Sequence, residues 1–356
     1  MISIKKRLEK ADLLRGKARY REALKLLKGA LKSSLDTEEE FQANLLAGHV
    51  YRMLGDFDKA ITHYETAIKK AIGLKDRTKE ADASVSLALS ERARGNWRDA
   101  LKLLEKAEKI YSKNDDAEAI AFLNWSKAGT YRIKGDIDKA IETFRAAYAQ
   151  FKKLKDGHAA GYCLNGLGGA TRVKGLFRGS MKYYSRANKL FTRLKEPFGL
   201  AYSYCGVGNA LRMEGDWKGA LQNFKKALVI YNKIGDIVSS SYTLWSVSKT
   251  YELMGKLPGS EKALKEAVKL FNKTKDPRGR IYCLLTEAEL AAVKGKKIPA
   301  LRQARIAFES AKEHSFGVEA CHASLLIGIL SGTPKNDCYK KLGLKLKYGT
   351  LPLNIP

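Results

Sequence analysis

Apolar residues recur with the period of an α-helix along most of the chain, in paired segments separated by short turns. Residues 41–54 (FQANLLAGHVYRML) place apolar side chains three or four positions apart, and residues 57–72 (FDKAITHYETAIKKAI) do so again after a short break at Gly55. This spacing predicts two helices joined by a tight turn, and it is the local unit from which the rest of the chain is built.

The helix pair repeats at a fixed interval of 40 residues. A small residue stands five positions after each turn glycine, and alanine stands seven positions later in every copy, as at Ala60 and Ala67. An earlier copy has Ala18 at the glycine position, 37 residues before Gly55, so the sequence predicts eight units in all. The turn glycines are Gly55, Gly95, Gly135, Gly175, Gly215, Gly255 and Gly295.

The regular spacing of the turn glycines and of the acidic residues in the other loop predicts where the first helix of each repeat begins and ends. Glycine accepts a positive φ at little cost and so ends the first helix as a C-cap. The aspartates of the other loop are suited to accept the unpaired backbone N–H groups at the start of the next first helix. The recurring acids are Asp76, Asp116, Asp156, Glu196, Asp236 and Asp276.

The second helices carry small residues on one face, which lets a neighbouring helix approach closely. Larger apolar residues such as Tyr64, Phe144 and Tyr184 lie between the small ones and fill the remaining space. One helix pair cannot bury both of its faces, so the units are expected to stack into a solenoid.

The motif G-[DN]-[FWI]-x-x-A-[IL], present as GDFDKAI, GNWRDAL, GDIDKAI and GDWKGAL, resembles the tetratricopeptide repeat. The 40-residue unit is similar to the repeats of Partner-of-Inscuteable scaffolds and bacterial Rap-type regulators. Leu176 departs from the motif after Gly175, while Pro258 and Pro299 fall in the first turn of their helices, where proline is tolerated.

We therefore predict an all-α fold, a right-handed α-solenoid of about eight helix pairs with a C-terminal capping helix and an extended tail. The expected solenoid covers residues 1–330 and the tail covers 331–356. The expected repeats are about 2–36, 37–76, 77–116, 117–156, 157–196, 197–236, 237–276 and 277–316, and the capping helix is 317–330.

The resemblance implies that the first helices line a concave groove, which such proteins use for binding. Two series of residues fall on the side of the first helices that is expected to face this groove, with amide and indole side chains between them. The arginine ladder consists of Arg52, Arg92, Arg132, Arg172 and Arg212. The aromatic and amide positions are Phe122, Tyr162, Tyr202, Tyr242, Tyr282, Trp125, Trp245, Asn165 and Asn209.

Guanidinium groups bind carboxylates and phosphates through paired hydrogen bonds, and aromatic faces stack on rings or apolar side chains. These residue types predict an elongated anionic ligand. A purely structural role is the alternative: the arginines would favour the helix dipole or pair with acids of neighbouring units, and the tyrosines would pack between helices.

The chain contains 66 Lys and Arg against 38 Asp and Glu, a formal charge of +28, which favours anionic partners. We expect a non-catalytic protein-interaction scaffold that binds an extended acidic or phosphorylated segment. Binding of RNA or single-stranded DNA is the first alternative, and a peptide-controlled regulator of the Rap type is the second. The sequence offers no defensible catalytic constellation, metal site or cofactor motif.

The cysteines Cys163, Cys205, Cys283, Cys321 and Cys338 are odd in number and lack a C-x-x-C pair, which argues against a disulfide framework. The N-terminal residues have no apolar run typical of a signal peptide, and no segment is apolar enough to cross a membrane, so a cytoplasmic protein is expected.

The tail has a different pattern from the repeats. Leucines alternate with lysines between Lys341 and Tyr348, which predicts an extended amphipathic segment. Three arrangements stay open for it: a flexible tail or one packed on the last helices, docking with a partner, and folding back along the solenoid.

Overall fold

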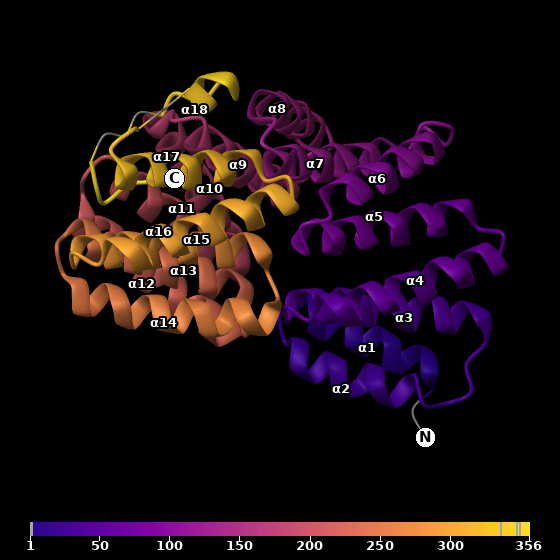
Figure 1. The fold of residues 1–356 in the computed structure, drawn as a ribbon. Helices are drawn as coiled ribbons and strands as arrows, with labels where there is room; N and C mark the ends of the chain where they lie inside the picture. Colours follow the sequence, from indigo (N-terminus) through magenta and orange to yellow (C-terminus); the bar gives the residue numbers. More distant parts are fainter. Residues whose placement is uncertain (1–2, 335–336, 347, 349) are drawn as a thin grey trace.

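The computed structural model describes residues 3–334, 337–346, 348 and 350–356. Its helices follow one another with short turns (Figure 1). Their bounds are α1 Ile4–Gly16, α2 Tyr20–Ala30, α3 Thr37–Met53, α4 Phe57–Gly73, α5 Arg77–Ala93, α6 Trp97–Tyr111, α7 Ala117–Lys134, α8 Ile137–Lys153, α9 Gly157–Val173, α10 Phe177–Leu194, α11 Pro197–Met213, α12 Trp217–Ile234, α13 Ile237–Leu253, α14 Leu257–Thr274, α15 Pro277–Val293, α16 Lys297–Glu313, α17 Gly317–Ser331 and α18 Asp337–Lys341.

The helices form consecutive pairs that stack into a right-handed α-solenoid, which confirms the predicted fold class. Each odd-numbered helix from α1 to α15 contacts the even-numbered helix that follows it in the chain. It also contacts the next odd-numbered helix. The odd-numbered helices therefore form the inner layer of the superhelix, and the even-numbered helices cover its outside. No helix among the described residues combines the length and the apolar character needed to cross a bilayer.

The predicted helix ends are confirmed. All seven turn glycines have φ between 71° and 97°, and Ala18 takes the same left-handed conformation with φ of 56°. Asp76 accepts a hydrogen bond from the backbone N–H of Lys79 at 2.9 Å, and the other aspartates of the series cap their helices in the same way. Glu196 also caps its helix, where it accepts from two backbone N–H groups.

The glycine-rich sequence in α9 and α11 is explained by aromatic packing between the helices. The ring of Tyr184 is buried, and a Cβ atom at Gly206 would lie 2.1 Å from it. Gly168 meets the same ring from α9. The glycines of α9 and α11 thus form a packing surface for this ring.

The superhelix contacts itself along a seam, which we define as the contacts between the turns after Gly55, Gly95 and Gly135 and the loops before α13, α15 and α17. The partners lie between 182 residues (Gly55 to Ile237) and 221 residues (Gly95 to Phe316) further along the chain, which is about four and a half to five and a half repeats. Trp97 Nε1 donates to the carbonyl of His314 at 3.2 Å, and Lys275 Nζ pairs with Asp58 at 2.7 Å. The seam encloses the concave side, so the groove is a channel.

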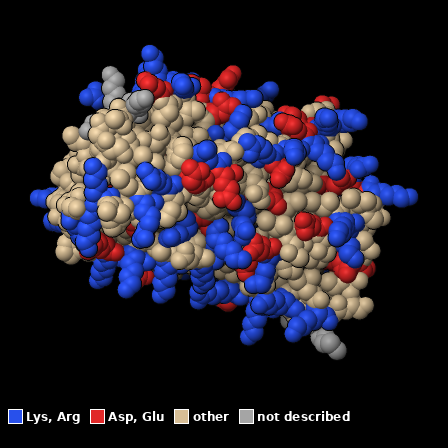
Figure 2. Space-filling view, in the orientation of Figure 1, with Lys and Arg blue, Asp and Glu red and all other residues tan. Residues whose placement is uncertain are grey.

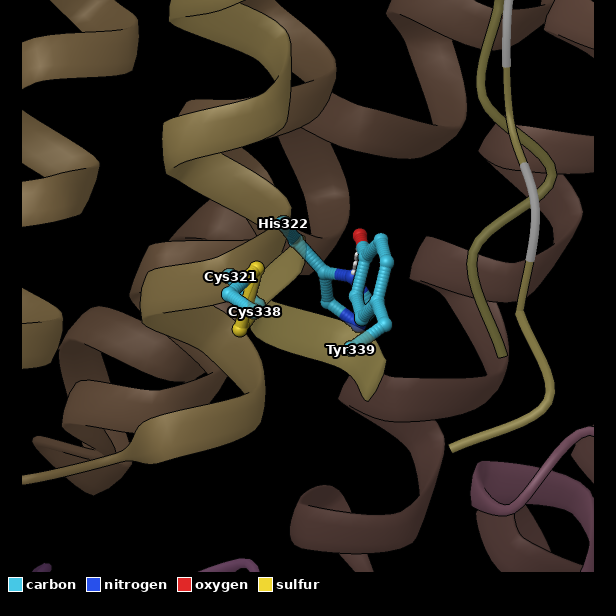
Figure 3. Close-up of a disulfide and its surroundings, with 4 residues drawn as sticks. All are labelled: Cys321, His322, Cys338 and Tyr339. Atoms are coloured by element: carbon cyan, nitrogen blue, oxygen red, sulfur yellow. Dashed lines mark hydrogen bonds between the residues drawn. A yellow bond between two sulfur atoms is a disulfide. The ribbon is translucent and has the colours of Figure 1, made fainter. Parts of the chain in front are cut away.

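The C-terminal part differs from the expected extended tail. Residues 337–341 form the short helix α18, and Cys338 on it forms a disulfide with Cys321 of α17 (Figure 3). The expectation that the cysteines would not form disulfides is wrong for this pair, because α18 folds back against α17. Beyond α18, the backbone N–H of Lys345 donates to the carbonyl of Lys174 at 2.8 Å. Lys347, part of the predicted alternation, lies outside the described residues.

Candidate ligand-binding channel

The arginine ladder lies on the inner layer. Arg92 and Arg212 each extend their guanidinium group toward the next repeat. The guanidinium of Arg92 lies 6.0 Å from the ring centre of Trp125 and donates to the carbonyl of Ser126 at 3.2 Å. Arg212 lies in the same way over Trp245, at 5.7 Å. A Cβ atom at Gly129 would be 2.2 Å from Arg92 Nη1, so glycine makes room for this arginine.

A cavity of about 290 Å³ opens inside the channel beside the middle of the ladder. Arginines from three successive repeats line one part of it, and the following repeats contribute aromatic and amide side chains together with the charged residues Asp276 and Arg278. The predicted residues that it brings together are Arg92, Arg132, Arg172, Tyr202, Asn209, Tyr242, Trp245 and Tyr282.

Arg92, Arg132 and Arg172 have no carboxylate partner within the described part of the chain, whereas Arg278, which also lines the cavity, pairs with Glu319 at 2.6 Å. Arg172 Nε and Nη1 and Arg132 Nε are buried without any hydrogen-bond partner. Burial, reinforced by the neighbouring charges of Arg132 and Arg52, lowers the pKa of Arg92 to about 9. Buried cations are costly unless paired, so the cavity favours an anionic group.

Arg212 is fully buried and binds the C-terminal segment of the chain. Its Nη1 donates to Asn354 Oδ1 at 2.5 Å, and its Nη2 donates to the carbonyl of Ile355 at 2.8 Å. Asn354 Nδ2 donates in return to the carbonyl of Arg212 at 3.1 Å. Of the arrangements considered for the tail, residues 350–356 therefore adopt the one folded back into the solenoid.

A buried ionic cluster, which the sequence analysis did not identify as part of the site, holds the other side of this segment. Lys249 Nζ pairs with Glu252 at 2.8 Å and with Glu289 at 2.7 Å, and all three side chains are buried. The backbone N–H of Leu353 donates to Glu289 at 2.5 Å. Burial raises the pKa of Glu289 to about 7. Lys249 and Glu252 are three residues apart and so lie on one helix face, and this spacing was the feature of the sequence that could have indicated the ion pair.

Other predicted residues lie outside this cavity. Phe122 is 41% exposed and stacks on Trp125, and Asn165 Nδ2 donates to the carbonyl of Gly199 at 3.3 Å. The predicted residues absent from the cavity lining are Arg52, Phe122, Trp125, Tyr162 and Asn165, and Arg212 contacts the C-terminal segment instead.

Three of the predicted tyrosines hold successive repeats together through their hydroxyls, whereas the structural alternative considered only the packing of their rings between helices. Tyr162 donates to Glu196 at 3.0 Å and Tyr242 to Asp276 at 2.9 Å, in each case an acid that caps the first helix of the next repeat. Tyr282 donates to Glu319 at 2.8 Å. Their hydroxyls are thus engaged within the solenoid, and Tyr242 and Tyr282 also line the cavity.

Two family models, both described as tetratricopeptide repeat, match residues 39–113 and 85–154. No curated protein sequence matches the chain. Among solved structures, a Rap protein complexed with Competence and Sporulation Factor has a TM-score of 0.63 at 15% identity, with 95% of this chain and 98% of that chain covered.

Two further structures of the same kind are similar. The Rap conjugation gene regulator of plasmid pLS20 with the Phr* peptide has a TM-score of 0.67 at 15% identity and covers 87% of this chain and 95% of its own. NprR with its cognate peptide NprX has a TM-score of 0.58 at 16% identity and covers 92% and 98%. The chain thus contains tetratricopeptide repeats, and its fold resembles that of the solved Rap-type regulators.

Proposed function

We propose that the protein is a non-catalytic, peptide-binding regulator or scaffold whose channel holds an extended segment bearing a carboxylate or phosphate. The observation that carries the proposal is that three of the arginines lining one cavity, Arg92, Arg132 and Arg172, have no carboxylate partner among the described residues, and that Arg132 and Arg172 have buried nitrogen atoms without a hydrogen-bond partner. A carboxylate or phosphate in the cavity would neutralise the charge of these guanidinium groups.

The fold comparisons support a peptide as the ligand class. The similar Rap structures are complexes with Competence and Sporulation Factor and with the Phr* peptide, and NprR is bound to the peptide NprX. The aromatic faces of Tyr202 and Trp245 provide apolar surface beside the arginines, which suits a segment that combines apolar and acidic side chains.

Nucleic acid is the competing partner because of the large positive charge. Figure 2 shows Lys and Arg side chains spread over the visible face with Asp and Glu among them. Lysines such as Lys102, Lys225 and Lys265 are exposed on the outer helices α6, α12 and α14. Charge of this kind gives weak, salt-sensitive attraction to phosphates, but it does not account for the unpaired arginines inside the channel.

Fluorescence anisotropy with two labelled pools of random nonapeptides tests the proposal. One pool contains two Glu at random positions and the other contains Gln at those positions. We expect the full-length chain to bind the Glu pool at least tenfold more tightly. A labelled single-stranded oligonucleotide is the third probe. Equal affinity for the two peptide pools, or tight binding of the oligonucleotide alone, contradicts the proposal.

A further inference from the structure

We infer that residues 350–356 are a tethered ligand of the channel, and that a partner segment displaces them by presenting an asparagine between two aliphatic residues. The inference rests on the proposed function and specifies the partner and the regulation of the same channel. It is carried by the contacts of Leu353, Asn354 and Ile355.

Asn354 is recognised through both ends of its amide. Its oxygen accepts from Arg212 Nη1, and its nitrogen donates to the main-chain carbonyl of Arg212. An aspartate has no donor for that carbonyl, and a leucine has neither group, so the pair of bonds selects an amide. Glutamine offers the same groups on a longer side chain, which cannot keep both contacts without moving the backbone.

The residues on either side of Asn354 provide apolar burial. Leu353 and Ile355 are each 1% exposed and belong to the core cluster that contains Trp245 and Tyr282. Removal of these two side chains from water favours the bound position of the segment. The main chain is held as well, through Leu353 N–H to Glu289 and the Ile355 carbonyl to Arg212.

Residues 350–356 lie next to the cavity that the proposed ligand would occupy. Pro356 lines the cavity together with Arg92, Arg132 and Arg172. A ligand that occupies both the cavity and the contacts of Arg212 must therefore displace residues 350–356. One that occupies the cavity alone does not compete for Arg212.

The chain keeps this segment near its site after release. The disulfide between Cys321 and Cys338 fixes α18 to α17, and the hydrogen bond from Lys345 N–H to Lys174 holds the following residues. A short tether of this type gives an effective concentration on the order of millimolar. A partner with similar contacts must exceed that concentration or add contacts, such as an acid placed at the cavity arginines.

The test uses full-length chains and a fluorescein-labelled nonapeptide amide with the sequence of residues 348–356, YGTLPLNIP. Asn354→Ala removes the amide contacts of the tethered segment, and Asn354→Arg places a second cation against Arg212. We expect the affinity for the added peptide to rise in the order wild type, Asn354→Ala, Asn354→Arg, by at least tenfold overall. Lys340→Ala, at an exposed position of α18, serves as the control and should match the wild type.

A second peptide, in which alanine replaces the asparagine, should bind the Asn354→Arg chain at least tenfold more weakly than the first. Equal affinity of all chains for the first peptide overturns the inference, as does equal affinity of the two peptides. If Asn354→Arg does not fold, the Asn354→Ala chain decides the result. Neither peptide contains an acid, so these outcomes are independent of the Glu and Gln pools that test the proposed function.

Discussion

Arg92 and Gly129 show how the channel depends on single residues. The guanidinium crosses from α5 to α7 and lies directly over the position where Gly129 has no side chain. The arginine is held by Trp125 and the carbonyl of Ser126, so its direction into the channel is fixed by the neighbouring repeat.

We predict that Gly129→Ala weakens binding of the Glu pool several-fold while leaving the chain folded. The added methyl group displaces the end of the Arg92 side chain, whereas alanine in a helix is itself favoured over glycine by about 1 kcal/mol. Anisotropy and urea unfolding measure the two effects separately. Gly73→Ala is the matched control, because no atom lies within 4 Å of its Cβ position; equal loss of binding in both variants contradicts the role of Arg92.

The repeat made many individual residues predictable, because each position is sampled several times. The turn glycines, the capping aspartates and the buried alanines of the second helices all follow from recurrence. The arginines were recognisable in the same way. Glu289, Asn354 and Ile355 were not, because each owes its role to a contact that occurs once and joins residues far apart in the sequence.

At the scale of elements, α17 and α18 form a unit that ends the solenoid. His322 of α17 lies beside the disulfide, and its Nδ1 is 2.6 Å from the hydroxyl of Tyr339 on α18 (Figure 3). Burial lowers the pKa of His322 to about 4, a shift that the nearby Glu319 opposes and that Arg278 and Lys249 reinforce. The imidazole is therefore neutral in the folded chain at neutral pH.

We predict that His322 makes the chain less stable in acid. The unfolded imidazole binds a proton near pH 6.5 and the folded one only near 4, so its contribution is complete above 6.5 and is lost as the pH falls toward 4. At pH 5 the loss amounts to roughly 2 kcal/mol. Urea unfolding at pH 7 and pH 5 should show a smaller difference for His322→Gln than for the wild type.

His158→Gln is the control for that comparison, because His158 is exposed on α9. It should keep the pH dependence of the wild type. If His322→Gln also keeps it in full, the buried imidazole does not couple α17 and α18 to pH.

The elements themselves were predictable, but α18 and its disulfide were not. Helix periodicity and caps define α1 to α17, whereas α18 has five residues and no amphipathic period to detect. The pairing of Cys321 with Cys338 depends on how the chain turns after α17, and cysteine spacing alone carries no such information.

At the scale of the whole molecule, the seam converts an open groove into a channel. Trp97 on α6 packs into a core cluster with residues of α13 to α17, far along the chain. The sequence could not predict this closure, because the superhelical pitch arises from small rotations that accumulate over successive repeats.

We predict that Trp97→Ala opens the seam. Loss of this indole should lower the unfolding free energy by about 3 kcal/mol and increase the radius of gyration in small-angle X-ray scattering. Trp217→Ala changes the same repeat position in α12, where the side chain is 36% exposed, and should change both quantities much less. Equal effects of the two substitutions contradict the seam as the cause of closure.

The most direct measurement compares binding of the Glu and Gln peptide pools by two chains that have each lost two positive charges. Arg132→Gln/Arg172→Gln removes them from the channel, and Arg145→Gln/Arg193→Gln removes them from exposed positions on α8 and α10. We predict that the preference for the Glu pool disappears in the first chain and persists in the second. Loss of the preference in both chains, or in neither, contradicts recognition of an anionic segment by the channel arginines.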